Sequence, residues 1–255
     1  MSTEAVATAT AAPVSHTDWM AKKIHSFVGV VPLGVYVVLH LSRNVSSMAG
    51  PKAFDNAIRQ TWTHPINYVW VVLLVYLPLI FHAGWGLKLV WESEKTSVFR
   101  NFNLANVRYF FQRLSGLGVL AFLFAHIFLT RFQVSMGWLQ DANINPGGQV
   151  TYGYFATHMT DWSKGTAIVY ILGILGTVYH LANGLTTFGI SWGITTGAKS
   201  IKRAEILALV FGLLLLALGY ATIVGFFMYP FHEFVTPHGP LSPTGILGPF
   251  MHYKT

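Results

Sequence analysis

Five apolar stretches constrain what this 255-residue chain can fold into, because each is long enough to cross a lipid bilayer. A helical crossing needs about 20 apolar residues, and we expect the spans at residues 24–47, 66–91, 107–132, 165–190 and 203–229. None has the continuous charged face of an amphipathic helix in a soluble protein, and the stretch from Ile206 to Met228 contains no charged residue. The sequence therefore predicts an all-α membrane protein, a bundle of five transmembrane helices.

Composition agrees with a membrane protein and excludes several kinds of chemistry. Only 10% of the residues are charged, compared with about 25% in soluble domains. The chain has no cysteine, which excludes thiol catalysis, iron–sulfur ligation, thiolate zinc sites and covalent haem attachment by this chain. Its net charge of +7 favours a cationic membrane edge over nucleic-acid binding.

Three segments follow from these patterns. Residues 1–21 are expected to be a disordered cytoplasmic leader, because the first 18 are small and polar and lack the basic-then-apolar layout of a signal peptide. Residues 22–229 form the transmembrane domain, interrupted by a long loop at 133–164 that is rich in Gly, Asn and Asp. Residues 230–255 carry five prolines and are expected to form an irregular outer tail.

Lysine and arginine residues are distributed unequally between the two sides of the membrane. With a cytoplasmic N-terminus, ten basic residues lie inside and six outside, although the outer loops are longer. The ten are Lys22, Lys23, Lys88, Lys95, Arg100, Arg108, Arg113, Lys199, Lys202 and Arg203, and the six are Arg43, Lys52, Arg59, Arg131, Lys164 and Lys254. Cytoplasmic loops carry the excess of positive charge, so the N-terminus is predicted inside and the C-terminus outside.

Four of the eleven histidines lie inside apolar spans: His40, His82, His126 and His180. An ionisable group inside a membrane is costly and indicates a function by default. For any one of them the alternative is a neutral histidine hydrogen-bonded to a neighbouring helix. With four histidines, the depth of each in the membrane can be compared, which tests whether they act together.

Alternating helix direction sorts these histidines into two layers. His40 follows Ile24 by 16 residues and His126 follows Val107 by 19, which places both in the outer half at about 1.5 Å per residue. His82 and His180 lie nine and ten residues before the inner ends of their spans, about 14–15 Å from the inner face. His40 is therefore predicted to pair with His126, and His82 with His180.

Two imidazoles that face each other across a bundle supply the two axial ligands of a b-type haem. Zinc would require three or four ligands, often with carboxylate or thiolate, and a proton relay would usually include buried acids. The sequence provides neither at these depths. Two haem b groups, one in each leaflet, account for all four histidines and would carry electrons across the membrane.

Haem propionates need cationic or hydrogen-bonding partners near each membrane surface. Arg43 and Arg131 follow the outer histidines closely and are candidate partners of the outer haem. Candidates for the inner haem are His25, Arg113 and Lys199. The alternative for each long cation is snorkelling to lipid headgroups.

The runs around the histidines carry a family resemblance. KKIHSFVGVVPLGVYVVLHL, LPLIFHAGWG, FQRLSGLGVLAFLFAHIFLTR and YHLANGLTTFGISWGIT resemble the cytochrome b membrane anchor of succinate dehydrogenase. They are most similar to the single-polypeptide, two-haem type of several bacteria, which is shared with related fumarate reductases. The resemblance covers residues 22–228 and implies the same pairing, with His40 and His126 at the distal haem and His82 and His180 at the proximal haem.

The resemblance also implies the function and the partners. A flavoprotein subunit oxidises succinate, an iron–sulfur subunit passes the electrons on, and the anchor delivers them through its haems to a quinone, menaquinone in most two-haem members. This chain would lie in the bacterial cytoplasmic membrane, without a dicarboxylate site of its own. Two alternatives remain open: a cytochrome b anchor of another dehydrogenase, such as hydrogenase or formate dehydrogenase, and a non-redox transporter that uses histidines for protons or metal.

Two features depart from compact members of this family. The 133–164 loop and the proline-rich tail are longer, and we expect them to cap the outer end or to contact a neighbouring protomer of a larger oligomer. Some relatives use an acidic residue near the distal haem for quinone protonation, and the resemblance does not assign this role to a particular residue of this chain. Asp55 is the nearest acid by position, and its alternative is a role as a plain surface residue.

Overall fold

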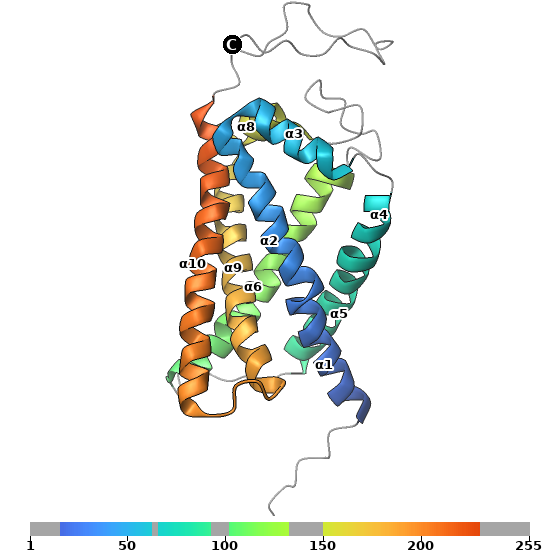
Figure 1. The fold of residues 1–255 in the computed structure, drawn as a ribbon, viewed down its shortest axis with the longest axis vertical. Coiled ribbons are helices and arrows are strands. Elements are labelled where there is room, and N and C mark those ends of the chain that lie inside the picture. Colours follow the sequence, from blue (N-terminus) through green and yellow to red (C-terminus); the bar gives the residue numbers. More distant parts are fainter. Residues whose placement is uncertain (1–15, 63–65, 93–101, 133–149, 230–255) are drawn as a thin grey trace, which may run out of the picture.

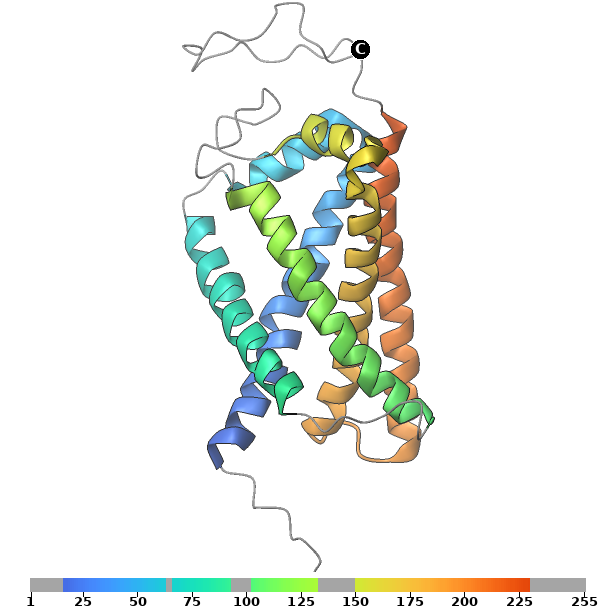
Figure 2. The same ribbon diagram turned by 180° about the vertical axis from the view of Figure 1, so that it is seen from behind.

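The computed structural model describes residues 16–62, 66–92, 102–132 and 150–229. Five helices in these residues are long and apolar enough to cross a membrane: His16–Ala49, Ile66–Trp91, Leu104–Phe132, Thr166–Ser191 and Ala198–Met228. They form a helical bundle (Figures 1 and 2) and confirm the five predicted spans. Residues 1–15 of the predicted leader, 133–149 of the long loop and the tail from 230 lie outside the described residues.

The first span consists of two helices, α1 (His16–Val30) and α2 (Pro32–Asn44). The break falls at Pro32, which has no N–H to donate to the preceding turn. Residues 16–21, which the sequence analysis placed in a disordered leader, are helical. Asp18 explains this earlier start, because its carboxylate lies in the first turn, where the helix dipole favours negative charge, and Lys88 Nζ lies 2.9 Å away.

The second and third spans each contain a π-helical turn. α4 (Ile66–Val71) continues through a π turn at Val72–Tyr76 into α5 (Leu77–Trp91). Pro78 at the start of α5 lacks the N–H that the carbonyl four residues earlier would normally accept, which explains a local change in hydrogen bonding there. α6 (Leu104–Ile127) ends in the other π turn, Phe128–Phe132.

The fourth and fifth spans, α9 (Thr166–Ser191) and α10 (Ala198–Met228), pack along their whole length (Figure 1). Their contact includes the buried residues Val178 and Leu215. A methyl group at Gly219 would lie 2.6 Å from Ile174 Cγ2, so this glycine lets the two backbones approach closely. Small residues serve this purpose in membrane bundles, where close packing drives association more than the hydrophobic effect does.

Two short helices lie across one end of the bundle, which we call the capped end; the opposite end, where α1 begins, is the α1 end (Figure 1). They are α3 (Pro51–Trp62) and α8 (Tyr152–Thr160). The chain enters α3 through a short 3₁₀ helix, Val45–Ala49, and Gly50, whose φ of 93° is accessible to glycine at little cost. The sequence predicts that the long loop caps the outer end or contacts a neighbouring protomer; its described part, residues 150–164, lies at one end of the bundle.

Aromatic side chains hold the capped end together. Phe54, Tyr152 and Phe226 form a cluster with rings 5.2–6.0 Å apart, and each is almost completely buried. Tyr152 donates its hydroxyl to Gly225 O at 2.6 Å, and burial raises its pKa to about 12. The phenol therefore stays protonated at physiological pH. Its hydrogen bond to Gly225 O links α8 to α10.

Candidate functional site

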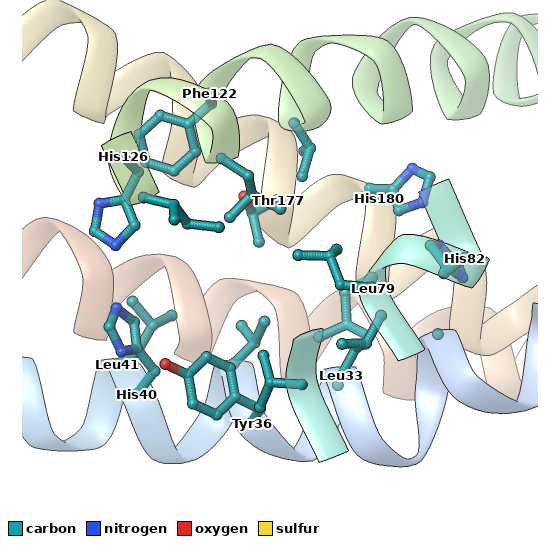
Figure 3. A pocket seen from close by; sticks show the side chains of 18 of the residues that line it. Leu33, Tyr36, His40, Leu41, Leu79, His82, Phe122, His126, Thr177 and His180 are labelled. Atoms are coloured by element: carbon teal, nitrogen blue, oxygen red, sulfur yellow. The ribbon is translucent and has the colours of Figure 1, made fainter. Parts of the chain in front are cut away.

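One cavity of about 1470 Å³ runs through the bundle. Typical pockets for a single small molecule measure about 300–1,000 Å³, so this cavity has room for more than one ligand of that size. All four intramembrane histidines line it, and its wall includes side chains from every span. Figure 3 shows the four imidazoles at two levels, with Leu33, Leu79 and Thr177 between them.

The structure brings together the two pairs that the depth argument predicts. The ring centres of His40 on α2 and His126 on α6 lie 5.8 Å apart, and the rings are nearly perpendicular. Those of His82 on α5 and His180 on α9 lie 6.0 Å apart, also perpendicular. We call these the outer pair and the inner pair, at the capped end and the α1 end respectively.

Three of the four imidazoles are held through Nδ1. His82 Nδ1 lies 3.0 Å from His25 O, His180 Nδ1 lies 3.1 Å from Gln112 O, and His126 Nδ1 lies 2.9 Å from the Tyr170 hydroxyl. A partner at Nδ1 fixes the ring orientation and leaves Nε2 for a metal, as the outer-shell partners of ligating histidines do.

His40 differs from the other three. Its Nε2 lies 3.0 Å from the amide nitrogen of Asn44, one turn further along the same helix, and its ring stacks on Tyr36. Asn44 has to release this nitrogen before His40 can bind an iron through Nε2. The outer pair therefore needs one side chain to move, whereas the hydrogen bonds of the His82 and His180 rings to other described residues are all at Nδ1.

The donor set fits a haem better than a bare metal ion. Metal–imidazole bonds are about 2 Å long, and each nitrogen lies about 1 Å from its ring centre, so an iron between two imidazoles would separate their ring centres by about 6 Å. The observed separations of 5.8 and 6.0 Å are close to this spacing. Among the described residues, no three His, Cys, Asp or Glu side chains gather as a metal site, as zinc would require.

Cationic side chains line both ends of the cavity. Arg43 and Arg131 lie at the capped end, and Lys22 and Arg113 at the α1 end. The guanidinium groups of Arg113 and Arg131 lie over tyrosine rings, 3.6 Å from the centre of Tyr109 and 4.9 Å from that of Tyr68. The candidate propionate partners Arg43, Arg131 and Arg113 therefore do reach the cavity, together with Lys22, which the sequence analysis did not select for this role.

The other candidates have different surroundings. Lys199 is exposed at the start of α10 and is not among the described residues that line the cavity. His25 lines the cavity but stacks on His82, with ring centres 4.1 Å apart and planes 4° from parallel. Asp55 is half-buried on α3, where it accepts a hydrogen bond from Tyr152 N at 2.7 Å, and is also absent from the described cavity wall.

A polar network that the sequence analysis missed leads from His180 to α10. Gln112 donates to His180 O at 3.2 Å, and Asn183 donates to Gln112 Oε1 at 2.7 Å. Asn183 Oδ1 in turn accepts two bonds from Arg108, whose guanidinium pairs with Glu205. The run FQRLSG contains Gln112, but nothing in a single sequence shows which helix this side chain faces.

Comparison with known proteins gives one informative match. No protein-family model matches the chain. The chain is 27% identical over 212 residues to the succinate dehydrogenase cytochrome b558 subunit of Bacillus subtilis (strain 168), and the match covers 83% of this chain and 97% of the relative. The predicted resemblance to the succinate dehydrogenase cytochrome b subunits is confirmed. At 83% of the chain, the match extends over most of the transmembrane region.

Proposed function

We propose that this chain is the membrane anchor of a succinate:quinone oxidoreductase, a dihaem cytochrome b that connects an iron–sulfur partner to a quinone. The observation that carries the proposal is the pair of facing imidazoles at each of two levels in one membrane-spanning cavity. The relative named as a succinate dehydrogenase cytochrome b558 subunit supports the assignment to this enzyme.

Each pair of histidines would hold one haem b, which supplies one-electron transfer when bound. His82 and His180 are the ligands of the inner site, and His40 and His126 those of the outer site. Arg43 and Arg131 at one end of the cavity, and Lys22 and Arg113 at the other, would neutralise the propionates. Leu33 and Leu79 give the space that separates the two sites a largely apolar wall.

The basic residues suggest how the chain is oriented. The α1 end, which carries Lys22, Lys23 and Lys202, would face the cytoplasm, where it would meet the iron–sulfur and flavoprotein subunits. The capped end would face outward. The outer site would then lie on the side where the quinone is reduced, and menaquinone is the quinone that the resemblance favours. In a bacterium this membrane would be the cytoplasmic membrane.

Purification of the intact complex from membranes tests the proposal. We expect a flavoprotein and an iron–sulfur protein to co-purify, and the dithionite-reduced spectrum to show b-type bands from about two haems per chain. His82→Leu should remove one haem and His40→Leu the other, because each substitution deletes one axial ligand. His158→Leu is the matched control, since His158 bonds to the Tyr154 carbonyl on α8 and is not in the described cavity wall.

Three results would contradict the proposal. A colourless protein would favour a transporter, and a co-purifying molybdenum or nickel enzyme would favour the anchor of a different dehydrogenase. Retention of both haems in His82→Leu and in His40→Leu would show that the ligands lie elsewhere.

A further inference from the structure

The two inner histidines are held by the same arrangement on two different helices. His82 Nδ1 lies against the carbonyl of His25, and a methyl group at Gly29 would lie 2.5 Å from His82 Cε1. His180 Nδ1 lies against the carbonyl of Gln112, and a methyl group at Gly116 would lie 3.0 Å from His180 Cε1. In both cases the glycine follows the carbonyl residue by four positions.

Helix geometry explains why the glycine follows the carbonyl residue by four positions. A helical side chain points back toward the N-terminus and covers the turn that precedes its own Cα. The side chain of residue i+4 therefore lies over the carbonyl of residue i, and a glycine there leaves that carbonyl bare. A carbonyl oxygen has a second lone pair beyond the one used in the helix, so it can accept a further bond from an imidazole that reaches the helix surface.

The polar side chain at the carbonyl residue adds a second contact to each imidazole. The His25 ring stacks on the His82 ring. The Gln112 amide nitrogen lies 3.2 Å both from His180 Nδ1 and from His180 O, and it can donate to the latter. Ser115 Oγ is 3.4 Å from His180 Nδ1. Each inner ring is therefore enclosed by one turn of a neighbouring helix: residues 25–29 of α1 and residues 112–116 of α6.

The outer histidines are held differently. His126 Nδ1 meets the Tyr170 hydroxyl, and the ring stacks on Phe122 of its own helix. His40 contacts Tyr36 and Asn44, both on its own helix. These partners are side chains, which can rotate, whereas the inner partners include backbone carbonyls, which cannot move without the helix.

We propose that residues 25–29 and 112–116 form two matched cradles, each a bare helix carbonyl with a glycine one turn later, that fix His82 and His180 with Nε2 toward the cavity. The cradles make Gly29 and Gly116 positioning residues of the inner site and leave the outer site independent of them. The inference rests on the proposed function only in that the inner pair binds a haem.

Glycine-to-alanine substitutions in the full complex test the cradles. Gly29→Ala should remove the inner haem, so that haem per chain falls from about two to about one, because the Cβ takes the place of the His82 ring. The Cβ added in Gly116→Ala would lie 3.0 Å from His180 Cε1, a looser contact than at Gly29, so this variant should retain both haems. We expect one of the haems to show a shifted midpoint potential and a shifted low-spin electron paramagnetic resonance signal. Gly84→Ala on α5 and Gly118→Ala on α6 are the controls, because an added Cβ meets nothing within 4 Å at either position.

The outcomes separate this inference from the proposed function. A wild-type complex without haem would refute the function itself. A wild-type complex with two haems, together with unchanged haem content and resonance signals in Gly29→Ala and Gly116→Ala, would overturn the cradles alone. Loss of both haems in Gly29→Ala, while the two control variants remain normal, would also overturn them, because a local cradle does not affect the outer pair.

Discussion

The Tyr170 hydroxyl is the outer-site counterpart of the inner backbone carbonyls. It lies 2.9 Å from His126 Nδ1, and its ring is in edge contact with the His126 ring. If His126 binds a metal through Nε2, Nδ1 carries the proton, and this N–H donates a hydrogen bond to the phenol oxygen. Such an acceptor raises the basicity of a ligating imidazole, which stabilises the oxidised metal.

Tyr170→Phe should therefore raise the midpoint potential of one haem. The loss of one neutral hydrogen bond costs about 1 kcal/mol. The potential shifts by the part of this cost that differs between the oxidised and reduced states, so the expected rise is at most about 40 mV for a one-electron couple. A redox titration followed in the visible spectrum measures the change. Tyr179→Phe is the control, because it removes a hydroxyl from the same helix at a ring that contacts Phe111 and not an axial histidine. Equal shifts in both variants would contradict the role of Tyr170.

At the scale of helices, α10 supports the site without contributing a histidine ligand to it. Its Glu205 pairs with Arg108 on α6, and Arg108 bonds to Asn183 on α9. Asn183 then bonds to Gln112, whose backbone carbonyl faces His180. Three helices are thus connected by polar contacts that run from Glu205 on α10 to His180 on α9.

The capping helices give Asp55 a structural role. Its carboxylate accepts from Tyr152 N, the first backbone N–H of α8, which links α3 to α8. Asp55→Ala should lower the free energy of unfolding by about 1–3 kcal/mol, since it leaves that N–H without its acceptor. Asp55→Asn keeps an oxygen at this position and should retain quinone reduction. Thermal denaturation and succinate-dependent quinone reduction measure these effects.

The two substitutions distinguish a structural carboxylate from a proton donor. A proton donor to quinone would lose activity in Asp55→Asn, at unchanged thermal stability, because the amide cannot exchange a proton in the same way. Normal turnover in Asp55→Asn with reduced stability in Asp55→Ala is the expected result.

The sequence predicts the spans and the histidine pairs because both depend on local information. Apolar length fixes the helices, and the rise per residue fixes the depth of a histidine such as His82. It does not predict which way a helix is rotated about its axis. For that reason only the structure shows the contacts of Gly29 and Tyr170. Lys199, which the sequence selects by its depth, is not among the described residues that line the cavity.

Short helices were also missed at the sequence level. α3 and α8 are 12 and nine residues long, and their stability depends on tertiary contacts more than on propensity. Phe54 and Tyr152 provide those contacts by packing on Phe226 of α10. The break at Pro32 is a local effect of the proline, but it lies within one continuous apolar run, so the sequence predicts a single unbroken span there.

At the scale of the whole molecule, the outward faces of the spans are apolar, as a protein surrounded by lipid requires. Leu172 on α9 and Leu207 and Leu214 on α10 are 61–70% exposed. Charged groups gather instead near the helix ends, with Lys199 and Lys202 at the α1 end and Lys52 and Arg59 on α3. The two ends therefore present distinct cationic surfaces to the two sides of the membrane.

Labelling of single cysteines tests which surface faces the cytoplasm. Because the natural chain has no cysteine, Lys199→Cys and Lys52→Cys each place one thiol at an exposed position, at the α1 end and the capped end respectively. The excess of lysine and arginine on the α1 side predicts that this end is cytoplasmic. A membrane-impermeant maleimide should label Lys52→Cys in intact cells and Lys199→Cys only after permeabilisation, and each variant is the control for the other. The reverse pattern would invert the topology and move the outer pair to the cytoplasmic half of the membrane.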